Sequence, residues 1–304
     1  MLTIPLRDGE QLQVRVIGHG ATPVILLHGF GSQSAHWLPN VWPYTKDFQF
    51  ILPDLRGFGH SHRTPLNQQD ALLNYAQDII DVLDHLGLEK VILAGISLGA
   101  LIGLKMNQLG HFDRVSQYLH IDQPPQVRNV DGWQDGLFGC EQAAMFERFT
   151  QLLEQTKSIG LDTAYLDLPK TLRYEMITLF GDFFGYAVSR TSQRRMLKLA
   201  FRYGEPIIAG RLIPTARWAS YMQIMNTYVN LDTDMRATLP EINIPMMQMV
   251  GMRSLMYPPQ GQLVIQNLVP HIEVIRFDDA GHLPMLDQPL KFQREFRRFL
   301  YART

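Results

Sequence analysis

The amino-acid sequence predicts an α/β fold in which a mostly parallel central sheet is flanked by helices. Short apolar runs, such as PVILL at 23–27 and VILAG at 91–95, alternate with segments whose apolar residues recur at helical spacing. This alternation stops over residues 124–238 and resumes with the strand expected at 245–250. A Gly-Ile-Ser-Leu-Gly pentapeptide at 95–99 stands between an apolar strand and an apolar helix. These observations predict one α/β core that carries a single inserted segment.

The first half of the core begins with a predicted hairpin over residues 2–17, which turns at Asp8-Gly9. The spacing of the apolar residues from Leu72 to Leu86 predicts an amphipathic helix that ends at Gly87. The other elements expected in this half are strands at 23–27, 48–53, 91–95 and 116–121 and a helix that begins near residue 98.

The inserted segment, residues 124–238, contains helical patterns but no convincing buried strand. We therefore expect a helical lid over this range, with the core formed by residues 1–123 and 239–304. The second half of the core is expected to contain strands at 245–250 and 272–277, a helix near 258–268, and a closing amphipathic helix with Phe292, Phe296, Phe299 and Leu300 on one face.

Composition and charge exclude several classes of protein. The 304 residues are 46% hydrophobic and carry a net charge of −1, so no global field attracts the chain to nucleic acid or to an anionic membrane surface. The single cysteine, Cys140, excludes an internal disulfide framework.

The sequence gives no sign of export or of a membrane span. The N-terminus alternates apolar and polar residues like a strand and carries Arg7, unlike a signal peptide. The longest nearly apolar run, residues 91–104, is too short to span a membrane. We expect a cytoplasmic protein without a membrane span.

Ser97 is the strongest candidate for a nucleophile. It stands in the Gly95-Ile-Ser-Leu-Gly99 pattern, at the point where an apolar strand is expected to turn sharply into a helix. Such a turn requires small residues on both sides, and it presents the serine hydroxyl at the C-terminal edge of the sheet, beside a helix N-terminus. The alternative is a buried turn serine without a chemical role.

The segment His28-Gly29-Phe30-Gly31 follows the strand at 23–27 directly, so its loop is expected at the same edge as Ser97. The backbone N–H of Phe30, together with that of Leu98, could stabilise the negative charge that develops on an attacked carbonyl oxygen. For the His28 side chain we favour a structural role.

With these motifs in place, the chain resembles the α/β-hydrolase superfamily, and within it the lidded, lipase- and esterase-like serine hydrolases. The resemblance covers nearly the whole core, but the lid carries no motif that can be assigned. It implies that His282, in the loop after the strand at 272–277, is the general base. The landmarks are HGFGS at 28–32, DLRGFGHS at 54–61, LDHLGLEKVILAGISLGA at 83–100, LPEINIPMMQMVG at 239–251 and AGHLPMLDQP at 280–289.

The position of the acid departs from the family pattern. The acid most often follows the strand at 245–250 in a G-x-x-D pattern, but this chain has Gly251-Met-Arg-Ser254 there. Some members of the superfamily place the acid at the end of the preceding strand, where this chain has Asp122. Because adjacent parallel strands run about 4.8 Å apart, an acid at the neighbouring strand end can reach the same histidine. We expect Asp122 to be the acid, and a change of Asp122 to Asn to be far more harmful than Ser254→Ala.

Alternatives to Asp122 stay open. One is a Ser-His dyad assisted by the neutral Ser254. Asp278 and Asp279 are too close to His282 in sequence, and Asp54 is expected to anchor its own loop. Three more carboxylates are expected to cap helices or to face solvent: Asp232, Asp234 and Asp287.

The lid supplies several phenylalanines and the facing edge supplies methionines, which suggests an apolar substrate pocket. Core packing explains the same residues equally well. One lid feature is more specific, since four basic residues recur every four positions and predict a basic stripe on one helical face. A solvated face is the favoured interpretation, and a dock for an anionic or carrier-linked acyl substrate is the alternative. The stripe consists of Arg190, Arg194, Lys198 and Arg202, and the candidate pocket residues are Gly29, Ile96, Ser254 and Tyr257.

The resulting hypothesis is a serine hydrolase that cleaves a carboxylic ester, or a related acyl compound, through an acyl-enzyme on Ser97. Neither a metal nor a cofactor is expected, and the expected partner is a small-molecule acyl substrate. Two alternatives remain. One is a carbon–carbon bond hydrolase of aromatic degradation with the same triad. The other is a ligand-binding homologue in which catalysis has weakened.

Overall fold

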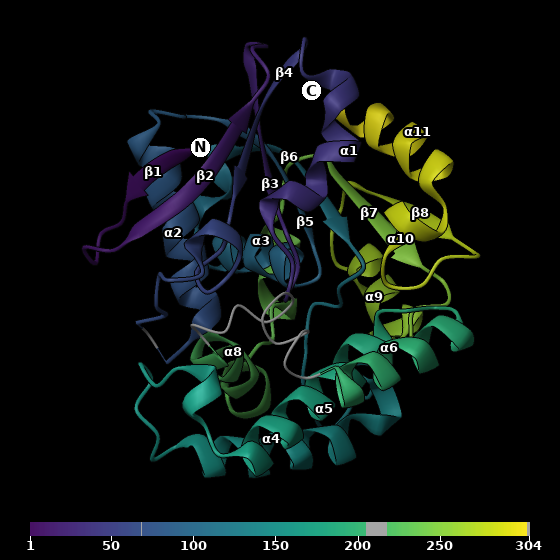
Figure 1. Cartoon of the computed structure of the whole chain (residues 1–304). Coiled ribbons are helices and arrows are strands. Elements are labelled where there is room, and N and C mark those ends of the chain that lie inside the picture. Colours follow the sequence, from purple (N-terminus) through teal and green to yellow (C-terminus); the bar gives the residue numbers. More distant parts are fainter. Residues whose placement is uncertain (68, 205–217, 303–304) are drawn as a thin grey trace.

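The computed structural model describes residues 1–67, 69–204 and 218–302. An eight-stranded sheet runs through its centre in the order β1-β2-β4-β3-β5-β6-β7-β8 (Figure 1). The first two strands, β1 (Leu2–Pro5) and β2 (Gln11–Ile17), form the predicted hairpin, and β2 also pairs with β4 in antiparallel fashion. All later pairings are parallel, as the alternation of strands and helices predicts.

The remaining strands and helices of the core lie close to their predicted positions. The strands are β3 (Thr22–Leu27), β4 (Phe48–Pro53), β5 (Val91–Ile96), β6 (Val115–Ile121), β7 (Met246–Gly251) and β8 (Ile272–Phe277). The helices are α1 (Leu38–Val41), α2 (Ala71–His85), α3 (Leu98–Gln108), α9 (Pro259–Leu263), α10 (Pro284–Asp287) and α11 (Pro289–Leu300). Short 3-10 turns are η1 (Ser34–Trp37), η2 (Trp42–Tyr44), η3 (Gly59–Ser61), η4 (His111–Arg114), η7 (Arg236–Glu241) and η8 (Val264–Asn267).

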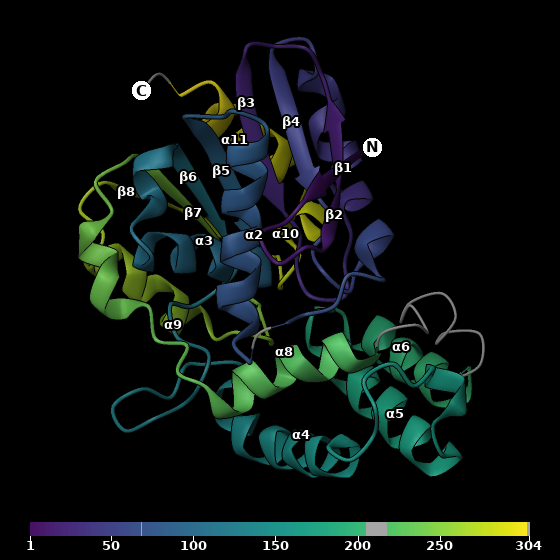
Figure 2. The same ribbon diagram turned by 90° about the vertical axis from the view of Figure 1, so that its left-hand side faces the viewer.

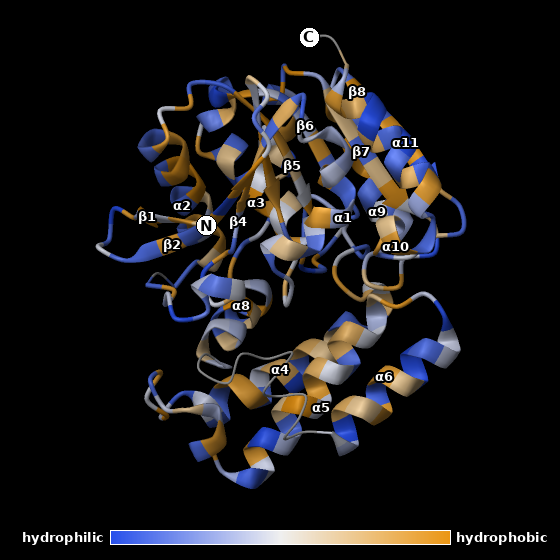
Figure 3. Ribbon diagram, turned by 45° about the horizontal axis from the view of Figure 1, so that its top comes forward, coloured by the Kyte–Doolittle hydropathy of each residue, from blue (hydrophilic) through white to orange (hydrophobic). Residues whose placement is uncertain are grey.

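Helices cover both faces of the sheet (Figure 2). Side chains alternate between the two faces of a strand, so neighbouring residues of β3 enter different hydrophobic clusters. Ile25 packs in the cluster that contains α2 and α3, and Val24 packs in the one that contains α1 and α11. In Figure 3, α11 carries hydrophilic and hydrophobic residues along its length, in agreement with the predicted amphipathic pattern.

The segment between β6 and β7 is helical in its described part and lies beside the C-terminal edge of the sheet (Figure 1). Apart from one bridge between Val130 and Trp133, no strand occurs in its described residues. The Thr227 hydroxyl accepts a hydrogen bond from the Ala71 N–H at 3.0 Å and thereby ties the segment to α2. Its helices are η5 (Gly139–Glu141), α4 (Gln142–Thr156), η6 (Tyr165–Asp167), α5 (Lys170–Tyr186), α6 (Thr191–Tyr203) and α8 (Trp218–Asn230).

One predicted helix is divided in the structure, and the predicted closing helix has a separate short helix before it. The helix expected near 258–268 consists of α9 followed by η8, where Gly261 and the β-branched Val264 and Ile265 have lower helix propensity than Ala or Leu. The closing helix is preceded by the short α10, and the two meet at Gln288, which adopts φ −132° and ψ 62° before Pro289. Within the described ranges, no helix combines the length and apolar character that crossing a membrane requires.

Candidate active site

Ser97 stands at the junction of β5 and α3 with φ 54° and ψ −123°. A non-glycine residue at positive φ is strained by about 1–3 kcal/mol, and such strain is typical of functional sites. Close packing explains the two flanking glycines. A Cβ on Gly95 would lie 2.3 Å from the carbonyl carbon of Gly99, and a Cβ on Gly99 would lie 2.4 Å from the Leu27 carbonyl oxygen. The sequence therefore folds here into a tight strand-to-helix turn that exposes the serine hydroxyl to a cavity.

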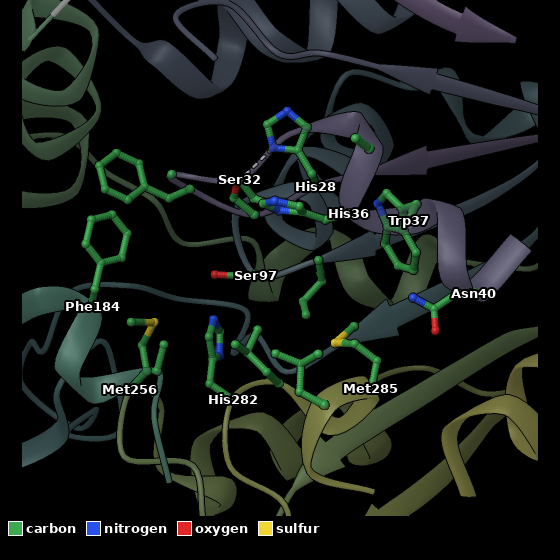
Figure 4. A pocket seen from close by; sticks show the side chains of 18 of the residues that line it. His28, Ser32, His36, Trp37, Asn40, Ser97, Phe184, Met256, His282 and Met285 are labelled. Atoms are coloured by element: carbon green, nitrogen blue, oxygen red, sulfur yellow. Dashed lines mark hydrogen bonds between the residues drawn. The ribbon is translucent and has the colours of Figure 1, made fainter. Parts of the chain in front are cut away.

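His282 lies in the loop between β8 and α10, and its side chain and that of Ser97 point toward one another in Figure 4. Two features hold the loop in place. The Gly281 N–H donates a hydrogen bond to Asp287 Oδ2 at 2.8 Å. A Cβ on Gly251 would lie 1.9 Å from the Gly281 carbonyl oxygen, so glycine at 251 allows the loop to pack against the end of β7.

Asp122 follows β6 directly, and its Oδ2 lies 2.7 Å from Nδ1 of His282. Its backbone has φ 45°, and its N–H donates to the Met249 carbonyl of the neighbouring strand β7 at 2.9 Å. Asp122 is fully buried, and His282 is 4% exposed. When Nδ1–H donates to the carboxylate, Nε2 is left free to accept a proton.

Three further donors from β7 and the segment after it hold the Asp122 carboxylate. The Gly251 N–H and the Gln262 side-chain amide donate to Oδ1 at 2.8 Å and 3.1 Å. The Ser254 hydroxyl donates to Oδ2 at 2.8 Å. The loop where the family most often places its acid thus supports an acid on the adjacent strand. Sequence reasoning missed Gln262, because no motif distinguishes this glutamine from others in a short helix.

The competing carboxylates have other partners. Asp54 accepts hydrogen bonds from the backbone N–H groups of Ser34 at 2.6 Å and His60 at 2.9 Å, as expected of a loop anchor. Asp279 forms an ion pair with Arg253 on the surface. The expectation that Asp287 caps the last helix is wrong, because its carboxylate instead accepts the Gly281 N–H and so supports the loop of the histidine.

The backbone of the loop after β3 lies against Ser97. A Cβ on Gly29 would lie 3.3 Å from Cβ of Ser97. The N–H of Leu98 belongs to the first turn of α3, where an amide has no partner within the helix. Phe30, the other candidate oxyanion donor, follows Gly29 on this loop and lines the same cavity as Ser97.

His28 has the structural role that the sequence favours. It is buried, its Nδ1 lies 2.8 Å from the Gly29 carbonyl oxygen, and its Nε2 accepts the Leu55 N–H at 3.0 Å. Burial lowers the pKa of His28 to about 4. The imidazole is therefore neutral near pH 7 and joins the loop after β3 to the loop after β4.

A cavity of about 540 Å³ opens beside Ser97 (Figure 4). It reaches from His282 and Met256 to the wall formed by η1 and α1. No Asp, Glu, Lys or Arg occurs among its described lining residues, so its polar side chains are those of His, Ser, Asn and Trp residues. The lining residues are His28, Gly29, Phe30, Gly31, Ser32, Ala35, His36, Trp37, Pro39, Asn40, Ile96, Ser97, Phe183, Phe184, Ala187, Met256, His282, Leu283, Met285 and Leu286.

Of the four candidate pocket residues, Gly29 and Ile96 line this cavity, whereas Ser254 and Tyr257 lie behind it. The Tyr257 ring packs against His282, with ring centroids 5.6 Å apart. Burial raises the pKa of the Tyr257 phenol, and hydrogen bonding to Ser97 and Gln123 lowers it in part. Tyr257 is therefore a neutral phenol at the base of the site and not part of the cavity wall.

The inserted segment forms one side of the cavity, through Phe183 and Phe184 of α5 and through Ala187, which follows this helix. Gly31 has φ +69°, and a Cβ there would lie 2.5 Å from Cζ of Phe184. The absence of a side chain at Gly31 thus allows Phe184 to pack directly on the loop that carries Phe30.

The predicted basic stripe is engaged in part with α5. Lys198 pairs with Asp182 at 2.8 Å, and the Arg194 guanidinium lies 4.5 Å from the centroid of the Tyr186 ring. Nε of Arg202 donates to the Tyr174 hydroxyl at 3.1 Å. These contacts give three of the four basic residues a role in packing α6 on α5.

The mostly parallel sheet, the strained serine between β5 and α3, and the buried Asp122–His282 pair define an α/β-hydrolase. Comparison with known proteins agrees: residues 24–294 match the alpha/beta hydrolase family, and the chain belongs to that family. This confirms the resemblance and the fold class inferred from the sequence.

An esterase and an enol-lactonase stand among the relatives by sequence. A pimeloyl-acyl-carrier-protein methyl ester esterase of Legionella pneumophila (strain Corby) is 25% identical over 266 residues, which cover 87% of this chain and 89% of the relative. The 3-oxoadipate enol-lactonase 1 of Acinetobacter baylyi is 24% identical over 305 residues, which cover 98% and 96%.

Solved structures agree on the fold. An esterase from Exiguobacterium antarcticum has a TM-score of 0.73 at 23% identity, covering 99% of both chains. A bromoperoxidase from Bacillus anthracis has a TM-score of 0.74 at 19% identity, covering 98% of this chain and 99% of that one. At these identities the likeness concerns the fold alone.

Proposed function

We propose that the protein is a serine hydrolase that cleaves a carboxylic ester through an acyl-enzyme on Ser97. One observation supports this most strongly: His282 faces Ser97 on one side and lies 2.7 Å from the buried carboxylate of Asp122 on the other. A nucleophile, a base and an orienting acid in this order form the arrangement that activates a serine hydroxyl. Esterases and an enol-lactonase among the relatives support the same reaction class.

The proposed reaction has two halves. Ser97 Oγ attacks the ester carbonyl carbon while its proton passes to Nε2 of His282, and the Phe30 and Leu98 N–H groups stabilise the oxyanion. His282 then gives the proton to the departing alcohol as the ester C–O bond breaks. In the second half His282 takes a proton from water, the hydroxide attacks the acyl-enzyme, and the carboxylic acid leaves with Ser97 reprotonated. Throughout, Asp122 fixes the imidazole tautomer and stabilises the imidazolium.

The cavity suggests the chemical character of the substrate. Its lining is mostly apolar and contains no ionisable acid, lysine or arginine in the described residues, which suits a neutral ester with an apolar acyl or aryl group. In this proposal residues 124–238 act as the lid, because Phe183 and Phe184 of α5 close one side of the cavity.

A carrier-linked acyl substrate is a narrower proposal, and it is supported by the methyl ester esterases among the relatives. The basic stripe is the candidate dock. Among its four residues, Arg190, at the N-terminal end of α6, is the one for which no contact with α5 occurs in the described residues. If the dock is correct, Arg190→Glu lowers turnover of a carrier-linked ester and leaves turnover of a small free ester unchanged. Equal effects on both substrates would contradict it.

The proposed function is tested by labelling with a fluorophosphonate, which reacts with an activated serine. The wild type should be labelled at Ser97, as located by mass spectrometry of the peptides, and Ser97→Ala should not be labelled. A control is Ser116→Ala, which removes a serine at the opposite end of β6 and should label like the wild type. A folded wild type that stays unlabelled and turns over no member of an ester panel would instead support a ligand-binding protein.

A further inference from the structure

Gln262 is a fully buried side chain beside the acid of the site. Its Nε2 donates to Oδ1 of Asp122 at 3.1 Å and to the Tyr257 carbonyl at 3.1 Å. Its Oε1 is buried and has no partner in the described part of the chain. An unpaired buried amide oxygen costs about 1–3 kcal/mol, whereas a hydrogen bond to a charged group contributes about 1.5–3 kcal/mol. Gln262 is thus a polar residue whose burial is costly, and both N–H groups of its amide donate hydrogen bonds.

The two carboxylate oxygens of Asp122 have separate sets of partners. Oδ2 accepts from His282 and Ser254, and Oδ1 accepts from the Gly251 N–H and from Gln262. Rotation of the carboxylate away from His282 would break the bonds at Oδ1. The donors to Oδ1 therefore determine which oxygen faces the imidazole.

Gln262 also holds the aromatic ring that contacts the base. It binds the Tyr257 carbonyl, and the Tyr257 N–H lies 3.4 Å from the Ser254 hydroxyl oxygen. The Tyr257 ring packs on His282 at a tilt of 58°. One amide group thus connects the acid that orients the imidazole with the ring that packs on it.

We propose that Gln262 is a positioning residue of this site, which fixes the Asp122 carboxylate and the Tyr257 segment in the geometry that His282 requires. This inference rests on the proposed function, because it assumes that Asp122 is the acid. Gln262 acts through Asp122 and touches neither the substrate nor Ser97. In this chain a side-chain amide from α9 thus helps to hold an acid that directly follows β6.

The test compares Gln262→Met with Gln117→Met in steady-state hydrolysis of a p-nitrophenyl ester. Gln117 is a matched control, because it is also buried, its Nε2 donates to a carbonyl oxygen (Phe299 O, 2.9 Å), and its Oε1 has no partner in the described residues. We expect Gln262→Met to lower kcat about tenfold with KM within about twofold, as for the loss of one hydrogen bond to a charged group. Gln117→Met should retain kcat.

Each change is then repeated in the Asp122→Asn background. If Gln262 acts through Asp122, Gln262→Met has little further effect there, so the two losses are not additive. An equal loss of kcat in both backgrounds, or a Gln262→Met enzyme with wild-type kcat, overturns the proposal. A negligible effect of Asp122→Asn itself would refute the proposed triad, which separates the two failures.

Gln262→Glu provides a second variant if the methionine variant does not fold. The introduced carboxyl group can still donate to Asp122 when it is protonated, whereas its ionised form repels Asp122, and the neighbouring carboxylate raises the pKa of such a group. We expect kcat relative to the wild type to fall as pH rises through the pKa of the introduced carboxyl group. A ratio that stays constant with pH would contradict a role through Asp122.

Discussion

His282 Nδ1 lies 2.7 Å from Oδ2 of Asp122, although 160 residues separate them in the chain. The contact forms because β6 and β7 are neighbours and the loop after β8 folds back over the end of β7. Ser254 occupies the position where the family most often has its acid, and it donates to the same carboxylate oxygen as the histidine. In the proposed triad the acid therefore follows β6 and not β7, and the loop after β7 contributes a hydrogen bond to it.

Ser254→Ala should have a modest effect on catalysis. Asp122 would keep the donors Gly251, Gln262 and His282, so we expect kcat to fall by less than about tenfold and the free energy of unfolding to fall by about 1.5–3 kcal/mol. Ester hydrolysis and denaturant titration measure the two effects. A loss of activity near that of a triad variant would show that Ser254 participates in the chemistry.

An aspartate at position 254 should be able to replace Asp122 in part. Ser254 Oγ and His282 Nδ1 share Asp122 Oδ2, so a carboxylate at residue 254 lies close to the imidazole. We expect the double variant Asp122→Asn/Ser254→Asp to have a kcat at least about tenfold higher than that of the single variant Asp122→Asn. Ser254→Asn in the same background controls for the size of the side chain. Equal rates for the aspartate and asparagine double variants would mean that the loop cannot present an acid.

Gly31→Ala should disturb the contact between α5 and the loop that carries Phe30. The new Cβ would lie 2.5 Å from Cζ of Phe184, at a backbone φ of +69°. We expect lower stability by about 1–3 kcal/mol and reduced kcat, because the loop must shift beside Ser97. Adding Phe184→Ala should recover part of the loss in stability, since it removes the clash but leaves the strain in φ. No recovery in denaturant titrations would indicate that Phe184 is not the obstacle.

Two buried histidines predict lower stability in acid. Burial lowers the pKa of His28 and of His120 to about 4, below the ordinary value of 6.5. Between pH 6.5 and pH 4 these two histidines bind more protons in the unfolded chain than in the folded one. Their contribution to the stability of the fold is therefore complete above pH 6.5 and diminishes as the pH falls toward 4. Each histidine should lower the free energy of unfolding by about 2 kcal/mol when the pH falls from 7 to 5.

The measurement is chemical unfolding at both pH values for the wild type and for His120→Gln. The variant should show the smaller decrease in the free energy of unfolding between pH 7 and pH 5. Decreases of equal size would contradict the assignment of this pH dependence to His120.

The sequence predicts the core well because its signals are local. The apolar run of β5, the glycines around Ser97 and the spacing of α2 each specify their own element, and parallel pairing follows from their order. The sequence could indicate Asp122 as the candidate acid because of its position at the end of a strand. In contrast, Gln262 and the partner of Asp287 depend on contacts between distant segments, which no local pattern encodes.

The central claim is that Asp122 is the acid of a Ser97–His282 site, and kcat/KM of Asp122→Asn for a p-nitrophenyl ester tests it most directly. Without the carboxylate the imidazole loses its correct tautomer and the stabilisation of its charge, so we expect a loss of about 10⁴-fold, mainly in kcat. Asp287→Asn is the control, because this carboxylate supports the loop of His282 and makes no contact with the His282 ring in the described structure. It should lower kcat/KM far less. An Asp122→Asn enzyme within about tenfold of the wild type would contradict the account.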